Sequence, residues 1–482
     1  MSIKIKIPRS SVVKLRRVVS FQLSLKWVLV ISFILSFTVR LIPELYFPVP
    51  VGFDTALYVT GAKYNSVPRL EFRMLQKFIL PYVYHVLKID LLTFMRIYAP
   101  LIHGLTTAVL VLYAAKVLSW DRIRLLVLTL LLSLTPGILR MAWDTHSQNL
   151  GTLMLAGMLV VMGRDLKPLR LLVILPLMAL IALTHQLVAV IALAILFVEA
   201  LASIRRPKKL VLMALAFVAC VLITTQLNPV LTLSGASKRI GAMLTAPEKG
   251  SITPFTLAIQ GLVVVWYIAP VAIIGLFGER RLLTWAIVSV AGFLLGFLVA
   301  NPGLLVPGRW ITYSSIPLAF FSANSISVSR RGIPWKKIAS ITFIVLTLST
   351  GVGMLLPSGT PITSLMHKAY DEMPEMLASS TARREHIEAI MELTGYLNSM
   401  KERSCLITHY PWFFWWSWYF YEGKTLYNGP SRTTEESLRT FIETRATKCD
   451  KVYIIWFTGL TWAKELKRKG ELALYEYRFT KS

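Results

Sequence analysis

The sequence predicts a polytopic α-helical membrane protein that ends in an α/β domain outside the cytoplasm. Three observations carry this prediction. Of 482 residues, 55% are hydrophobic and only 16% are charged. Repeated apolar runs approach the roughly 20 residues that a helix needs to cross a hydrocarbon core of about 30 Å. Beyond residue 357 the composition becomes that of a soluble domain, because more than half of the 25 acidic residues lie in the last quarter of the chain.

The apolar runs predict about eleven membrane spans. Their centres lie near residues 35, 106, 131, 155, 177, 194, 218, 266, 291, 318 and 347. Residues 1–26 form a basic amino terminus and residues 27–357 form the membrane domain. Segments on the side of the amino terminus carry more than twice as many Lys and Arg as those on the other side. We therefore expect a cytoplasmic amino terminus, an outward carboxyl-terminal region and a location in the plasma membrane.

Charge excludes two other classes of protein. The net charge of +27 does not indicate nucleic-acid binding, because most basic residues lie in the short loops where the positive-inside rule expects them. The spans are almost free of carboxylates and show no internal repeat, which argues against an ion-coupled transporter.

The first apolar segment is long enough to span and lacks a small-residue cleavage pattern, so no cleavable signal peptide is expected.

Two outward segments are long enough to carry structure. The first covers residues 43–92. Its residues 69–80 mix charged side chains with apolar ones at helical spacing, which predicts a helix lying in the membrane interface. The segment also holds several acidic residues, Glu44 among them. The second segment, residues 227–254, is rich in Gly, Ser, Thr and Pro. That composition favours a flexible loop that lies over a cavity as a lid.

A Pro-Ser-Gly-Thr-Pro linker at residues 357–361 precedes the last domain, which covers residues 358–482. Helical patterns near 383–401 and 433–446 alternate with strand-like runs at 405–408 and 452–457, which predicts a small α/β domain without a Gly-rich phosphate loop. Cys405 and Cys449 both stand at strand entries. They form a disulfide if the two strands are neighbours, or remain free buried thiols. Cys220 is a small apolar residue of a span.

Asp54 is the strongest single lead to function. It stands eight positions beyond the first span, which ends near Tyr46, within the sequence Gly-Phe-Asp-Thr-Ala-Leu-Tyr. A carboxylate at the outer membrane surface can remove a proton from an acceptor or hold a metal ion. The alternative is structural, because Asp is also a good N-cap for a short helix that begins at Thr55.

The span pattern, the outward Asp54 in residues 50–58 and the outward last domain together resemble the GT-C class of integral-membrane glycosyltransferases. The resemblance covers nearly the whole chain in architecture, but its sequence motifs are short. It implies a polyprenyl-phosphate-linked or polyprenyl-diphosphate-linked sugar donor, a glycan, lipid or protein acceptor on the outer face, and inverting transfer with Asp54 as the base. The Asp-Glu pair frequent in that loop is here Asp54-Thr55, which leaves a single acid.

The resemblance also gives a meaning to the cluster Arg-Met-Ala-Trp-Asp-Thr-His-Ser-Gln-Asn at residues 140–149. GT-C relatives often carry a second acid in the matching loop. It implies that Asp144 orients the acceptor or shares a divalent cation (Mg, Mn or Ca) with Asp54, with His146 as a further ligand. The alternative is a polar turn at the interface in which Asp144 caps the next span.

Three more residues are candidates for contacts with substrate or phosphate. Arg309, just before a late span, resembles the Arg with which GT-C members hold the donor phosphate, although an Arg at this depth also serves as a snorkelling anchor. His185, at the outer turn between two spans, faces the reaction cavity or is only a hydrogen-bonded structural residue. Tyr58 follows Asp54 by one helical turn.

An aromatic run at residues 412–421 contains four Trp, three Phe and two Tyr. It provides either a surface for sugar or lipid, or the core of the last domain together with an anchor at the membrane. His409, just before it, is a polar candidate without an assigned role. A non-catalytic flippase or lipid exporter is the alternative for the whole chain, since it too needs a lipid-sized cavity and basic phosphate contacts. Catalysis requires Asp54, Asp144 and Arg309 to converge on one outward cavity.

Overall fold

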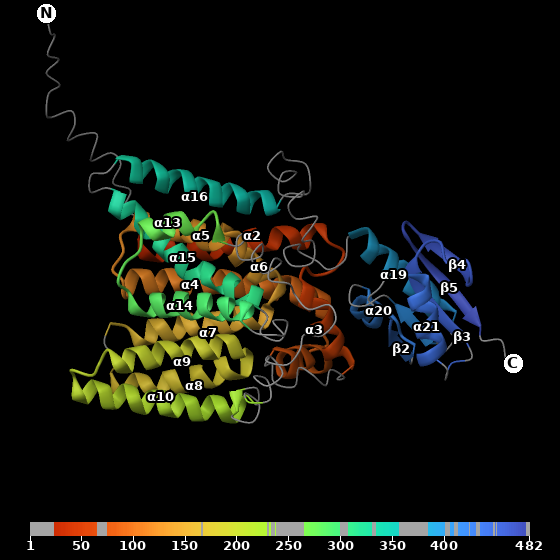
Figure 1. The fold of residues 1–482 in the computed structure, drawn as a ribbon, viewed down its shortest axis with the longest axis horizontal. Coiled ribbons are helices and arrows are strands. Elements are labelled where there is room, and N and C mark those ends of the chain that lie inside the picture. The colour runs from red at the N-terminus through yellow and green to blue at the C-terminus, as the bar shows by residue number, and fades with distance from the viewer. Residues whose placement is uncertain are drawn as a thin grey trace, which may run out of the picture.

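The computed structural model consists of a long helical bundle with a small sheet domain at one end (Figure 1). It describes residues 24–64, 75–164, 167–228, 265–298, 307–329, 334–355, 384–400, 405–408, 413–423, 425–429, 434–446 and 451–478, and the single positions 231, 232, 237 and 449. The predicted lid at residues 227–254 lies mostly outside the described residues. His409 and residues 65–74 of the first outward segment lie outside them as well.

Most of the bundle helices lie side by side along one common direction (Figure 1). Their bounds are α2 Leu25–Tyr46, α4 Leu91–Lys116, α5 Arg122–Leu134, α6 Pro136–Asp144, α7 His146–Met162, α8 Pro168–Thr184, α9 Gln186–Leu201, α10 Pro207–Leu227, α13 Ala269–Ile274, α14 Arg280–Leu294, α15 Pro307–Ser329 and α16 Pro334–Leu355. Ten of the predicted span centres fall within these helices. The centre near residue 266 comes just before α13.

Five of the described helices are long and apolar enough to cross a membrane, and α5 and α6 add a sixth if this pair, bent by 58°, is one span. Helices α8 and α9 are shorter but also apolar. A membrane setting is therefore confirmed, whereas the count of eleven crossings stays a prediction. The break between α5 and α6 has a simple cause, because Pro136 has no amide hydrogen to continue the backbone ladder of α5.

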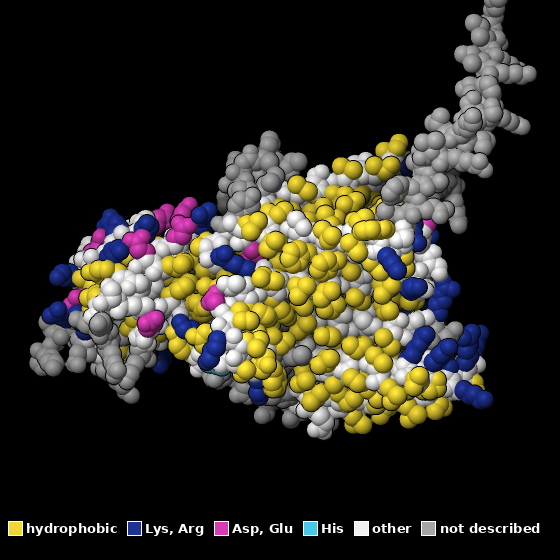
Figure 2. Space-filling model, turned by 180° about the vertical axis from the view of Figure 1, so that it is seen from behind, with side chains coloured by type: hydrophobic (Ala, Val, Ile, Leu, Met, Phe, Trp, Pro, Cys, Tyr) yellow, Lys and Arg dark blue, Asp and Glu magenta, His cyan; other side chains and the backbone are white. Residues whose placement is uncertain are grey.

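Figure 2 shows apolar side chains over most of one face of the bundle and Lys and Arg gathered at the end far from the sheet domain. Leu169, Leu172 and Ile338 are among the exposed apolar residues, and each is more than two-thirds exposed. A lipid-facing surface explains this exposure. The positive-inside rule assigns this basic end to the cytoplasm. The orientation of the bundle in the membrane stays a prediction, and the distribution of Lys and Arg agrees with it.

The described part of the sheet domain contains five strands and three helices. The strands are β1 Cys405–Thr408, β2 Thr425–Asn428, β3 Lys451–Phe457, β4 Lys464–Lys469 and β5 Leu472–Arg478, and the helices are α19 Arg384–Ser399, α20 Phe414–Phe420 and α21 Glu435–Arg445. The strand order is β2-β1-β3-β5-β4. β1 pairs in parallel with β2 and β3, while β5 pairs antiparallel with β3 and β4. Both strand-like runs and both helical patterns of the sequence are found at the predicted places.

Cys405 and Cys449 form a disulfide. The parallel pairing of β1 with β3 sets Cys405 opposite Val452, so Cys449, just before β3, lies within reach. The sequence predicted a disulfide only if the two strands are neighbours, and β1 and β3 are neighbours. Cys220 is a buried free thiol of α10, as predicted.

The sheet domain contacts the bundle through α20 and helix α3, Phe53–Tyr64. Three α3 side chains donate to backbone carbonyls of the aromatic run: Thr60 Oγ1 to Trp415 O at 3.1 Å, Lys63 Nζ to Tyr419 O at 2.8 Å and Tyr64 OH to Tyr421 O at 3.1 Å. Burial in this contact lowers the pKa of Lys63. The aromatic run thus forms core and also fixes the sheet domain to the helix that carries Asp54.

Candidate functional site

The loop before α3 places Asp54 at the end of the bundle that faces the sheet domain. Gly52 has a φ of 134°, a conformation that only glycine adopts without strain. The helix begins at Phe53, so Asp54 lies in its first turn and not at its cap. An acid in the first turn is favoured by the helix dipole. The side-chain contacts of Asp54 are therefore the informative feature.

Asp54 is 5% exposed and is bound by residues from two helices. Arg309 donates from Nη2 to Oδ2 at 3.0 Å, and the Tyr58 hydroxyl lies 3.3 Å from the same oxygen. Arg309 stands in the first turn of α15, and its side chain is 27% exposed. Three sequence candidates, Asp54, Tyr58 and Arg309, are thus brought into direct contact across 255 positions of sequence.

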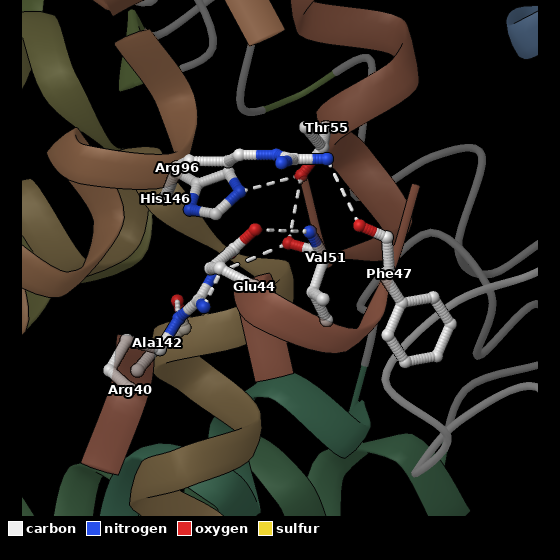
Figure 3. A network of polar contacts seen from close by, with 8 residues as sticks. All are labelled: Arg40, Glu44, Phe47, Val51, Thr55, Arg96, Ala142 and His146. Carbon is white, nitrogen blue, oxygen red and sulfur yellow. Dashed lines mark hydrogen bonds and ion pairs between the residues drawn. The ribbon is translucent and has the colours of Figure 1, made fainter. Parts of the chain in front are cut away.

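A buried ion pair fixes the loop that precedes α3 (Figure 3). Arg40 Nη1 lies 2.6 Å from Glu44 Oε1, and both side chains are almost fully buried. Glu44 Oε2 accepts from the amide of Val51 at 3.0 Å, while Arg40 donates to the carbonyls of Val51 and Ala142. Both backbone polar groups of Val51, three residues before Asp54, are therefore held by one ion pair. Glu44 was expected in the outward loop, but it lies in the last turns of α2.

Thr55 connects the loop to α7. Its hydroxyl lies 3.2 Å from the carbonyl of Val51 and 2.7 Å from Nε2 of His146 (Figure 3). When the hydroxyl donates to Val51, its oxygen accepts from Nε2–H, which leaves the Nδ1 lone pair as the acceptor of the ring. His146 is therefore a neighbour of the Asp54 loop, and its Nε2 contact is with Thr55.

Arg96 of α4 holds the beginning of the same loop. Its Nη2 donates to the carbonyls of Phe47 and Pro48, at 3.0 and 2.6 Å (Figure 3). Arg40, Glu44, Thr55 and Arg96 were not singled out from the sequence. One signal could have found the first two, because an Arg and a Glu four residues apart at the end of an apolar span predict a buried pair with a positioning role.

Two candidate site residues, Asp144 and His185, are placed by their positions along the helices. Asp144 is the last residue of α6, two positions before His146, and its side chain is outside the described structure. His185 is a buried residue between α8 and α9. Because α7 and α8 are joined at the basic end of the bundle, the start of α7 and the end of α8 share the opposite end. His185 thus lies at the same end of the bundle as His146.

The described residues do not by themselves form a metal site. Among them, no group of three or more His, Cys, Asp and Glu is placed to hold an ion. Asp54 is occupied by Arg309, and Nε2 of His146 by Thr55. A cation shared by Asp54, Asp144 and His146 stays a prediction, and no step of the mechanism below depends on it.

Solved structures resemble this fold over most of its length. ArnT from Cupriavidus metallidurans, in the apo state, superposes with a TM-score of 0.54 over 93% of this chain and 97% of ArnT, at 13% sequence identity. The arabinofuranosyltransferase AftD from Mycobacteria gives a TM-score of 0.49 at 12% identity, and this chain spans 40% of it. No protein-family model and no curated protein sequence matches the chain. The described bundle and the sheet domain at its end therefore share their fold with ArnT, which is a GT-C glycosyltransferase.

Proposed function

We propose that this protein transfers a sugar from a polyprenyl-phosphate-linked donor to an acceptor outside the cytoplasm. The observation that carries the proposal is the pair of Asp54 and Arg309, joined at 3.0 Å at one end of a bundle with the GT-C fold. Inverting transfer needs a base for the acceptor and a positive charge for the departing phosphate. The pair supplies both groups at one place.

In the proposed reaction, Asp54 accepts the proton of an acceptor hydroxyl as its oxygen attacks the anomeric carbon. The new carbon–oxygen bond forms as the bond from the anomeric carbon to the lipid phosphate breaks. The proton remains on Asp54, and the electron pair of the broken bond remains on the phosphate. Attack from the face opposite the phosphate inverts the anomeric centre.

Arg309 is proposed to hold the phosphate of the donor. One guanidinium nitrogen, Nη2, is bound to Asp54, and a guanidinium has five N–H donors in a fixed fork. The remaining donors can reach phosphate oxygens while Nη2 keeps the carboxylate in place. The side chain of Arg309 is also the more exposed of the two, at 27% against 6% for Asp54. This difference favours Arg309 as the partner that meets the donor first.

A flippase or lipid exporter remains the alternative. It too requires an arginine for lipid phosphate, but it does not require a buried carboxylate beside that arginine. Acid–base chemistry explains the burial of Asp54 against Arg309 and Tyr58 better than transport does.

We infer the outward orientation of this end from the charge asymmetry of the loops. The Cys405–Cys449 disulfide supports this orientation, because disulfides persist in oxidising compartments.

Purified protein in lipid nanodiscs, incubated with a panel of radiolabelled polyprenyl-phosphate hexoses and pentoses and with glycan, lipid and peptide acceptors, tests the proposal. Label should move from at least one donor to an acceptor. Protein that moves labelled lipid between leaflets of a vesicle but forms no glycosidic product from any donor would instead support the transporter.

A further inference from the structure

The first turn of α7 buries four consecutive polar side chains. His146, Ser147, Gln148 and Asn149 are each at most 2% exposed. Each also has at least one buried polar atom without a hydrogen-bond partner among the described residues, and Gln148 has two, Nε2 and Oε1. A buried carboxamide without partners destabilises a fold, so a site that keeps one needs an explanation.

Gln148 lies on the side of α7 that faces α15. One helical turn further along, Thr152 Oγ1 and Tyr313 OH share a hydrogen bond of 2.9 Å. Gln148 lies one helical turn before Thr152 on α7. Arg309 likewise lies one helical turn before Tyr313 on α15. Both helices begin against the first turns of α3, through His146 and Arg309, and therefore run in the same direction. Gln148 and Arg309 thus stand at the same level on two helices that the Thr152–Tyr313 hydrogen bond joins.

The chemistry of the two side chains differs. Arg309 carries a charge and fits phosphate, whereas a carboxamide is neutral and offers two donors and an acceptor. Neighbouring hydroxyls of a sugar ring present both donors and acceptors, and a buried carboxamide can bind them in pairs. We propose, on the basis of the transferase function inferred above, that Gln148 binds the hydroxyls of the sugar while Arg309 binds the phosphate attached to it.

This assignment places the sugar between Gln148 and Asp54, so that the anomeric carbon lies next to the base. Selectivity then follows from a carboxamide that has no hydrogen-bond partner among the described residues. A site that is built to bind a hydroxyl rejects a ligand that lacks it, because the polar group of the protein would remain buried and unpaired. Gln148 is therefore a specificity residue for the sugar, and it has no part in binding the lipid phosphate.

The test compares three lipids on the full chain in nanodiscs: polyprenyl phosphate, polyprenyl-phosphate glucose and polyprenyl-phosphate arabinose. Wild-type protein should bind at least one of the glycosylated lipids about 10-fold or more tightly than polyprenyl phosphate, as two buried hydrogen bonds would give. Gln148→Met keeps the length of the side chain and removes its hydrogen bonds. It should abolish this preference and leave the affinity for polyprenyl phosphate within about twofold.

Gln226→Met makes the same substitution at an exposed position of α10 and should change neither affinity. If Gln148→Met does not fold, Gln148→Glu preserves the shape, removes the N–H donors and should lose the same preference. A preference that survives these changes would overturn the assignment and indicate that water satisfies Gln148. Wild-type protein that binds all three lipids equally would overturn it while leaving the proposed donor class intact. Failure to bind any of them would overturn both proposals.

Discussion

Arg309 donates a hydrogen bond from Nη2 to Oδ2 of Asp54, at 3.0 Å, from the first turn of a helix that begins more than 250 residues further along the chain. The contact joins the first turn of α3 to a late helix of the bundle. It gives each residue a partner that the sequence did not predict. The proposed function depends on this contact, because it joins the proposed base to the proposed phosphate ligand.

Arg309→Lys separates a phosphate ligand from a membrane anchor. Lysine snorkels as well as arginine, so an anchor would tolerate the change. A phosphate ligand would not, because lysine retains the charge but loses the planar two-point fork. We expect donor binding or transfer to weaken by about 1–3 kcal/mol. A donor titration on correctly inserted protein measures this.

Arg122→Lys is the matched control, since Arg122 is an exposed residue at the start of α5 and its replacement should leave donor affinity unchanged. Donor binding and transfer in Arg309→Lys that equal those of wild-type protein would remove Arg309 from the site.

The Arg40–Glu44 pair can be tested against an exposed pair of the same spacing. Glu44→Gln leaves the charge of Arg40 buried without its counter-charge, so the free energy of unfolding should fall by about 3–5 kcal/mol. Glu388→Gln breaks the contact between Arg384 and Glu388, whose side chains are 60% and 42% exposed, and should cost about 0–1 kcal/mol. Thermal unfolding of both variants in one detergent compares them. Equal shifts in the unfolding temperature would show that the buried pair does not stabilise the loop.

Orientation can be tested by reporters fused after Ser482. The charge asymmetry of the loops predicts that residues 365–482 lie outside the cytoplasm. Alkaline phosphatase, which needs an oxidising compartment, should therefore be active in the fusion, and a reporter that works only in the cytoplasm should be silent. The reverse pattern would place the sheet domain inside the cell and would contradict the assignment of Asp54 to the outer face.

A cation held by Asp54, Asp144 and His146 predicts that chelation with EDTA abolishes transfer and that Mg, Mn or Ca restores it. The measurement is the rate of transfer before chelation, after it and after each ion is added back. Transfer that continues at its original rate in EDTA would remove the cation from the mechanism.

Much of the fold could be predicted from local patterns. Apolar runs place the bundle helices, and alternating strand-like and helical runs place β1, β3, α19 and α21, because both signals depend on neighbours in sequence. Asp54 and Arg309 were singled out because they stand near the ends of apolar spans and match positions that the GT-C resemblance gives a role. Their direct contact was not predicted, because it depends on how helices far apart in sequence pack.

Glu44 illustrates the other limit. A carboxylate at the end of a span is expected in the water-exposed loop, since burial of a charge is costly. Here Arg40, one turn earlier, neutralises it, and the pair is further satisfied by Val51 and Ala142. The helix can therefore continue past Glu44 to Tyr46. Whether such a carboxylate is buried or exposed depends on partners from other segments of the chain, and these partners cannot be identified from one stretch of sequence.

The most direct measurement of the central claim is single-turnover transfer by Asp54→Asn with donor already bound. Asparagine keeps the size of the side chain and can still accept from Arg309 and Tyr58, but it cannot take the proton of the acceptor. If Asp54 is the base, the rate should fall by about 10² or more, with donor affinity and unfolding temperature close to wild type. Asp90→Asn, at the cap of α4, should leave the rate unchanged. Near-normal transfer in Asp54→Asn would contradict the account.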